Sequence, residues 1–134
     1  MTAQGTAIIA GTADGPVLRL AAPISFWGGV DPKSGKITQP THPDFEASVA
    51  GKILFLPGAI GSSSSSAIML ELMRIGKAPS ALIMQQVDAI LSLGVVVAKE
   101  MGYGTIPVVE ISQFDFSNGD QVVVTDSGLI ARRD

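Results

Sequence analysis

The sequence predicts a mixed α/β fold that contains a segment of parallel sheet. Two runs, 52–56 and 81–84, are apolar apart from Lys52 and are typical of buried strands because turn residues bound them. Between these runs, residues 65–75 repeat apolar side chains at helical spacing, and Gly76 is the kind of residue that ends a helix. Strand, helix and strand in succession indicate parallel pairing.

Before this central region, the pattern indicates strands and a long loop. Residues 7–10 and 16–20 read as strands around a turn at 12–15, where Asp and Gly favour chain reversal. Residues 22–44 are rich in proline and glycine, which predicts a long loop. Loops of this length in compact domains usually have a functional role or face a partner.

After the central region, the strand–helix rhythm continues. Residues 87–93 predict a short helix closed by Gly94, and the valine-rich run 95–98 predicts a third strand. Residues 105–110 predict a further strand, with Pro107 at an edge or a bulge. Residues 121–125 and 129–131 predict a closing hairpin across 126–128.

Size and composition predict one folded domain over residues 1–134 that is partly covered by a partner. Hydrophobic residues are 46% of the 134 and charged residues only 16%, which excludes a disordered chain. So few charges leave apolar surface for another protein to cover. The net charge of −3 without a basic run argues against nucleic acid and anionic membranes as partners. No apolar run is long enough to cross a membrane, so we expect a cytoplasmic protein.

The most informative segment for chemistry is 56–66, where a buried strand leads through glycines and five serines into the best helix. Helix N-termini favour anions because their first N–H groups lack partners within the helix. Glycine allows close approach, and serine hydroxyls add hydrogen bonds. The alternative interpretation is helix capping by serine. The segment is neither a Walker loop, which needs lysine, nor a nucleophile elbow, which needs a different glycine spacing and a histidine partner.

The second candidate is the segment 23–36, which holds the sole tryptophan beside a glycine pair. In one interpretation, Phe26 and Trp27 fill the core and Asp31 forms an Asx turn. In the other, the segment is a partner-facing or substrate-lid loop; its residues are Ser25, Phe26, Trp27, Gly28, Gly29 and Asp31. The sole histidine, His42, stands between prolines and is expected to be a solvated loop residue.

Three motifs together resemble a known family. They are Ser25–Pro32 (Ser-Phe-Trp-Gly-Gly-Val-Asp-Pro), Gly61-Ser62-Ser63 after a Leu-Pro-Gly strand end, and Gly76-Lys77-Ala78-Pro79. The chain resembles the small, swivelling-domain subunit of aconitase X over about residues 5–130. The resemblance implies a swivelling β/β/α domain, similar to the swivel domain of aconitase, that docks on a large catalytic subunit.

The resemblance also implies a chemistry, in which the two subunits form a hydro-lyase that dehydrates a small hydroxy acid. An iron–sulfur cluster or iron is expected on the large subunit, which suits a chain with no cysteine. By analogy with aconitases, Ser62 would be the general base, with Gly61, Ser63 and Ser64 binding substrate. Ser64 stands where aconitases place a substrate-binding arginine, so anchoring would fall to the partner or to backbone N–H groups.

Two substrates are consistent with this family. Archaeal small subunits, whose enzymes dehydrate mevalonate 5-phosphate, usually carry Gly-Ser-Thr-x-Gly-Ser, whereas this chain has serine throughout 62–66. That departure favours cis-3-hydroxy-L-proline, converted to Δ1-pyrroline-2-carboxylate. Within this scheme Ser65 and Ser66 are expected to act mainly as helix caps. A non-catalytic module of the same fold is the remaining alternative, but a phosphohistidine domain would need histidine at the helix start, where only serine is found.

Overall fold

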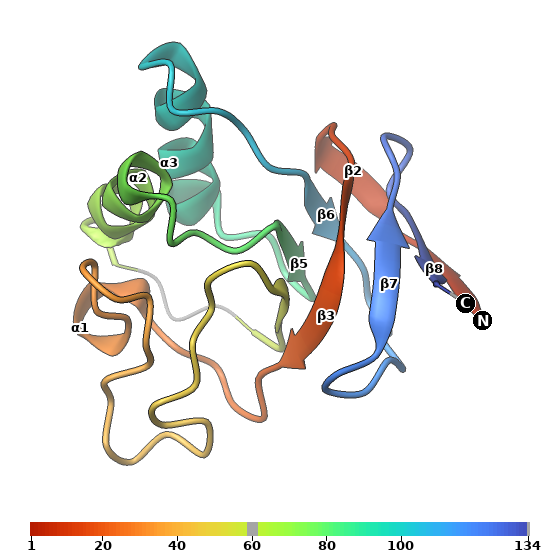
Figure 1. The fold of residues 1–134 in the computed structure, drawn as a ribbon, viewed down its shortest axis with the longest axis horizontal. Coiled ribbons are helices and arrows are strands. Elements are labelled where there is room, and N and C mark those ends of the chain that lie inside the picture. The colour runs from red at the N-terminus through yellow and green to blue at the C-terminus, as the bar shows by residue number, and fades with distance from the viewer. Residues whose placement is uncertain (59–61, 134) are drawn as a thin grey trace.

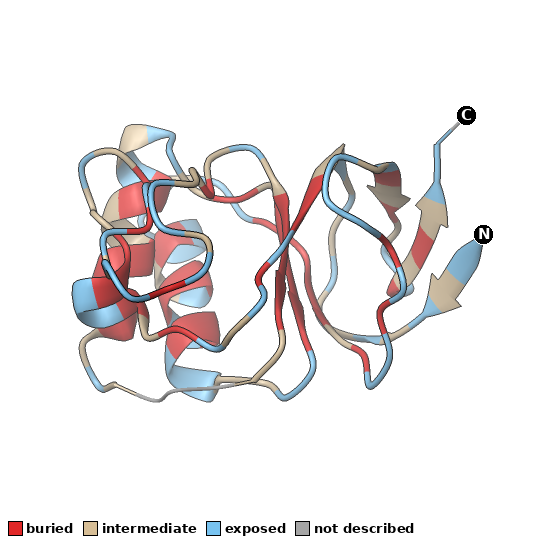
Figure 2. Ribbon diagram, turned by 90° about the horizontal axis from the view of Figure 1, so that it is seen from below, coloured by how far each residue is buried: buried red, intermediate tan, exposed pale blue. Residues whose placement is uncertain are grey.

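The computed structural model describes residues 1–58 and 62–133 and arranges them in three layers (Figure 2). Helices form one outer layer, a mainly parallel sheet lies in the middle, and an antiparallel sheet forms the other outer layer. This confirms both the mixed α/β class and the β/β/α arrangement that the resemblance implies. The elements of the described residues are β1 (Thr2–Gln4), β2 (Thr6–Ile9), β3 (Ala13–Arg19), α1 (Phe26–Gly29), β4 (Ile53–Leu56), α2 (Ser65–Ile75), β5 (Ala81–Met84), α3 (Ala89–Glu100), β6 (Val108–Glu110), β7 (Gln121–Val124) and β8 (Leu129–Arg132).

The strand order is β1-β8-β7-β3-β4-β5-β6-β2 (Figure 1). Strands β3, β4, β5 and β6 run parallel, as the strand–helix rhythm predicts. Strand β3 belongs to both sheets, because residues 13–16 pair with β7 and residues 17–19 pair with β4. The chain also passes between the layers at Gly5, where any Cβ would clash with Val109 Cγ1. The layers are therefore joined by continuous backbone.

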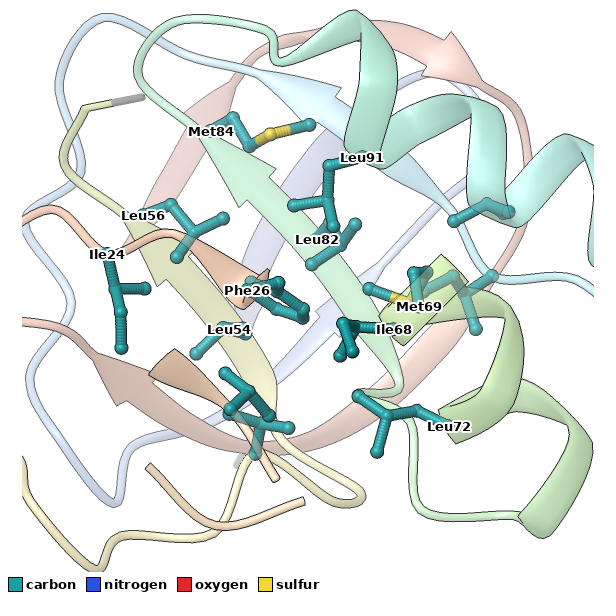
Figure 3. Packing of buried hydrophobic residues seen from close by; sticks show 14 of the residues in the cluster. Ile24, Phe26, Leu54, Leu56, Ile68, Met69, Leu72, Leu82, Met84 and Leu91 are labelled. Atoms are coloured by element: carbon teal, nitrogen blue, oxygen red, sulfur yellow. The ribbon is translucent and has the colours of Figure 1, made fainter. Parts of the chain in front are cut away.

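The middle sheet separates two apolar cores. In β4, Leu54 and Leu56 face the helices, while Ile53 and Phe55 face the antiparallel sheet. This alternation follows from the two-residue period of a strand, and both faces are apolar because both are covered. On the helix side, Phe26 points in among the sheet residues and Ile68 of α2 (Figure 3).

One sequence-based prediction in this region is wrong. The pattern predicts a strand at 95–98 after a helix ending at Gly94, but α3 continues through these residues to Glu100. Gly94 lies inside α3, and a Cβ there would be 2.7 Å from the Ser66 carbonyl oxygen and 2.9 Å from Met69 Cβ. Glycine therefore allows α3 to pack closely on α2. The strand that completes the parallel segment is instead β6, within the predicted 105–110.

Smaller differences occur toward the N-terminus. The sequence predicts Asp14 and Gly15 in a turn, yet they lie within β3 and pair with β7. The long loop 22–44 contains the short, kinked α1, and β1 has no counterpart among the predicted strands. Pro107 lies just before β6, which is an interior strand between β5 and β2. The Gly76 helix end and the β7–β8 hairpin are confirmed.

Candidate functional site

The serine segment enters α2 through a turn that Ser62 closes. The Ser62 Oγ accepts a hydrogen bond from the Ser64 backbone N–H at 3.3 Å, and the Ser62 carbonyl oxygen accepts one from Ser65 at 3.1 Å. Ser64 directly precedes the helix, but its side chain makes no capping hydrogen bond. Ser62 therefore caps the turn that leads into α2, whereas the N-cap residue Ser64 itself has no side-chain cap. Neither Ser65 nor Ser66 has that role, so the capping prediction for them is not supported.

The serines differ in burial. Ser63 is exposed, Ser62 and Ser64 are half-buried, and Ser65 is buried. Among the described residues, no hydrogen-bond partner is found for the buried Oγ of Ser65. Gly61, which the sequence placed beside Ser62 at this site, lies outside the described residues. The structure thus presents Ser62, Ser63 and Ser64 to solvent at the N-terminus of α2.

The loop at 25–31 divides its two aromatic residues between core and surface. Phe26 is buried under α2, whereas 59% of the Trp27 surface is exposed. Trp27 borders a groove of about 410 Å³ that also touches Asp31 and, on α2, Ile68. The sequence offered core filling and partner contact as alternatives. The buried Phe26 fits core filling, and the exposed Trp27 is accessible to a partner. The structure brings this loop against the same helix that carries the serines.

Hydrogen bonds hold this loop in place. The Thr38 N–H donates to the Gly29 carbonyl oxygen at 2.9 Å, and the Asp31 N–H donates to the Lys36 carbonyl oxygen at 2.9 Å. Gly28 has a φ of 79°, a conformation that glycine adopts without strain. A second buried hydroxyl, the Oγ of Ser25, also has no partner among the described residues.

Asp31 forms the Asx turn that the sequence suggested. Its Oδ1 accepts the Lys33 N–H at 3.1 Å, and its Oδ2 accepts the Ser34 hydroxyl at 2.8 Å. The Lys33 amide and then the Ser34 hydroxyl lower the pKa of the Asp31 carboxyl, because both donate to its charged form. Asp31 is therefore a structural carboxylate at the rim of the Trp27 groove.

His42 does not behave as the sequence suggested. Only 5% of it is exposed, and its Nδ1 accepts the Asp44 N–H at 3.0 Å while Nε2 lies 2.9 Å from the Ala22 carbonyl oxygen. An acceptor at Nδ1 places the proton on Nε2, which donates to Ala22. The ring thus links the backbone at Ala22 to the backbone at Asp44 through hydrogen bonds. The prolines beside His42 pointed to solvent, and no local pattern signals this role.

Arg19 is the charged residue at the carboxyl end of β3 and was not singled out from the sequence. Its guanidinium donates to the Phe114 carbonyl oxygen and, at 3.4 Å, to that of Phe116, and it lies 5.6 Å from the centre of the Phe55 ring. Phe55 faces the antiparallel sheet and not the helices. Arg19 is therefore engaged on the side of the middle sheet opposite the serines.

The donor set of this chain does not fit an iron–sulfur cluster. Cysteine is absent from the sequence, and His42 is its only histidine. Over residues 1–58 and 62–133, no three His, Asp or Glu side chains come together as a metal site would require. In the same residues, no helix has the length and apolar character to cross a membrane.

Comparisons with known proteins converge on one family. The aconitase X swivel domain family matches residues 2–131. A cis-3-hydroxy-L-proline dehydratase of Hypocrea jecorina is 42% identical over 84% of this chain, which spans only 19% of that protein. A phosphomevalonate dehydratase small subunit of Thermococcus onnurineus is 33% identical over 97% of both chains. The crystal structure of Thermococcus kodakaraensis aconitase X in its holo-form superposes with a TM-score of 0.90 at 32% identity, over 100% of this chain and 99% of that one.

Proposed function

Because the chain belongs to the aconitase X swivel domain family, we propose that it is the small subunit of a dehydratase and completes an active site on a large catalytic subunit. Its relatives are named dehydratases, either as much longer proteins or as small subunits. The observation that carries the proposal is the position of Ser62 at the start of α2, half-buried and hydrogen-bonded through its Oγ to the Ser64 amide.

In this proposal, Ser62 is the general base that removes the proton α to the substrate carboxylate. A serine hydroxyl is a weak base until its alkoxide is stabilised. The Ser64 N–H already points at Oγ, and an N–H donor strengthens its bond when the acceptor becomes charged. The positive end of the α2 dipole acts in the same direction. The turn that caps the helix therefore also favours the charged form of Ser62.

Gly61, Ser63 and Ser64 are proposed to bind the substrate. The side chain of Ser64 is too short to reach a carboxylate as an arginine would, and Arg19 is engaged on the other side of the sheet. The substrate carboxylate would then be held by backbone N–H groups at the helix start and by cations of the large subunit.

The favoured substrate is cis-3-hydroxy-L-proline. Loss of the Cα proton to Ser62 and of the 3-hydroxyl as water would leave an enamine, which tautomerises to Δ1-pyrroline-2-carboxylate. Two dehydratases named for this substrate are 42% and 39% identical to the chain. Mevalonate 5-phosphate is the second candidate, favoured by a phosphomevalonate dehydratase small subunit that matches over 97% of its length at 33% identity.

The iron–sulfur cluster or iron of the enzyme is proposed to lie on the large subunit, since the donor set of this chain does not fit one. The loop at Ser25, Phe26, Trp27, Gly28, Gly29 and Asp31 is proposed to face that subunit. Backbone hydrogen bonds at Thr38 and Asp31 hold this loop in place, which supports a fixed contact surface rather than a movable lid. We place the assembly in the cytoplasm.

The test separates base chemistry from helix capping at Ser62. In the assembled complex, Ser62→Ala removes both roles, whereas Ser62→Asn keeps a capping side chain without a hydroxyl. We expect both variants to lower kcat by at least about 100-fold, the lower end of general-base contributions. Only Ser62→Ala should also lose stability, by about 0.5–2 kcal/mol. Ser117→Ala, at an exposed serine in the loop before β7, is the control and should keep kcat within a few-fold.

Three results would overturn parts of the proposal. A Ser62→Asn complex with near-normal kcat would show that the hydroxyl is not the base, and a loss at Ser63 or Ser64 instead would move the base along the turn. Assays of both substrates side by side decide specificity. Turnover of mevalonate 5-phosphate without turnover of hydroxyproline would reverse the preference between the two substrates.

A further inference from the structure

Helix α3 is apolar on both of its faces, although one face is in solvent. No charged residue lies between Asp88 and Lys99. Leu91, Val95 and Ala98 are buried against the core, whereas Ile90, Leu93 and Val96 are exposed, with 52% of the Leu93 surface accessible. A helix that is apolar all round is usually enclosed on all sides. The outer face of α3 thus has the composition of a covered surface.

A groove runs along this face between α3 and α2. It has a volume of about 210 Å³, and its lining residues are Ser66, Ala67 and Leu70 of α2 with Leu93, Gly94 and Val97 of α3. Gly94 lets the helices approach closely, because a side chain there would meet the Ser66 carbonyl oxygen. Apolar cavities on the order of 150 Å³ accept a benzene ring. The groove can therefore receive a single large apolar side chain.

We propose that this α2–α3 groove is a docking site for the large subunit, which seats an apolar side chain between Leu70 and Leu93. The inference rests on the proposed function, because that function requires a large subunit to reach Ser62. Ser66 belongs both to the serine segment and to the groove, so the two surfaces are continuous on the first turns of α2. A subunit that covers the helix start also meets the groove.

The same continuity argues against a second copy of this chain as the occupant. A copy seated in the groove would cover Ser66 and Ala67, beside the serines that the large subunit must reach. The relatives support a larger partner as well. In the Hypocrea dehydratase the matching region is only 19% of the protein, so a far larger remainder of the same chain is there to cover it.

The experiment measures assembly and not catalysis. The chain and the large subunit from the same source are purified separately, and the Kd of the complex is measured for Leu93→Glu, Leu70→Glu and the control Ile8→Glu. Ile8 is a comparably exposed aliphatic residue, at 44%, but it lies on β2 outside both helices. Circular dichroism and Tm of each free variant establish that it is folded.

We expect Leu93→Glu and Leu70→Glu each to weaken assembly at least about tenfold, because an unpaired charge buried at an apolar contact is strongly unfavourable. Ile8→Glu should stay within about threefold, well inside that difference. Backbone amides of 90–97 should gain protection from hydrogen exchange in the wild-type complex. Normal assembly of both folded helix variants would overturn the inference, as would a homodimer that Leu93→Glu dissociates while the complex is unaffected.

Failure of this inference is distinguishable from failure of the proposed function. A complex that assembles through the groove yet dehydrates neither substrate would refute the function and leave the docking site. An active complex whose Kd is unchanged by Leu93→Glu would refute the docking site and leave the function.

Discussion

At Ser62, helix capping and base chemistry depend on the same hydrogen bond. A capping oxygen accepts an N–H, and the Ser64 amide supplies it at 3.3 Å. The same donor lowers the cost of negative charge on that oxygen. Capping alone would not need the four further serines that follow. The sequence therefore locates the turn correctly, whereas the choice of Ser62 as the capping residue, and not Ser65 or Ser66, depends on the backbone path.

The Asp31 turn is stabilised by two donors to the carboxylate. The Lys33 amide and the Ser34 hydroxyl lower the Asp31 pKa, so the turn is stabilised at neutral pH and loses that stabilisation only as the pH falls through a value below 3.8. Ser34→Ala removes one donor and should raise the Asp31 pKa toward its ordinary value. A carboxyl-detected NMR titration measures this change. An unchanged Asp31 pKa would show that the hydroxyl does not stabilise the carboxylate.

The burial of His42 and the exposure of Trp27 mark the limit of prediction from residue types. Flanking prolines and sequence position suggested a solvated histidine, yet the ring bridges the Ala22 carbonyl and the Asp44 amide. Phe26 and Trp27 are adjacent and similar in chemistry, and only the kink of α1 sends one inward and the other outward. Such outcomes depend on contacts between residues distant in sequence.

At the scale of elements, α3 shows how local preference can mislead. The run Val95-Val96-Val97 favours a strand, and a preceding glycine is typical of a helix end. In the structure, packing on α2 outweighs both preferences, because Gly94 permits a helix contact that any larger residue would block. Strands β4 and β5 and helix α2 were predictable, since in these segments local pattern and tertiary packing agree.

Gly94→Ala tests this account of α3. Alanine is the better helix former by about 1 kcal/mol, so an isolated helix would gain stability. Here the new Cβ would be 2.7 Å from a backbone oxygen, and overpacking of this kind costs roughly 1–3 kcal/mol or more. We expect a net loss of stability in chemical denaturation. Ala89→Gly, at the exposed first residue of α3, should cost no more than about 1 kcal/mol. Stabilisation by Gly94→Ala would contradict the close approach of α2 and α3.

At the scale of the whole molecule, the three layers explain the composition. The middle sheet has one apolar core on each face, which uses much of the hydrophobic content, and α3 adds an apolar outer surface. The low charged fraction pointed to a partner without indicating where it would bind. The layer order could not come from local pattern, since the pairing of β1 with β8 and of β2 with β6 joins segments far apart in the sequence.

The free subunit should fold alone and bind no iron. Because both cores are closed by residues of this chain, the free subunit should unfold cooperatively in thermal denaturation. Because it has no cysteine, it should bind no stoichiometric iron after anaerobic reconstitution with iron and sulfide, and it should have no dehydratase activity. Iron analysis of the chain alone and of the complex formed with the large subunit checks both statements. One iron or more bound per free chain would show that this subunit contributes ligands, and the cluster could then no longer be assigned to the partner alone.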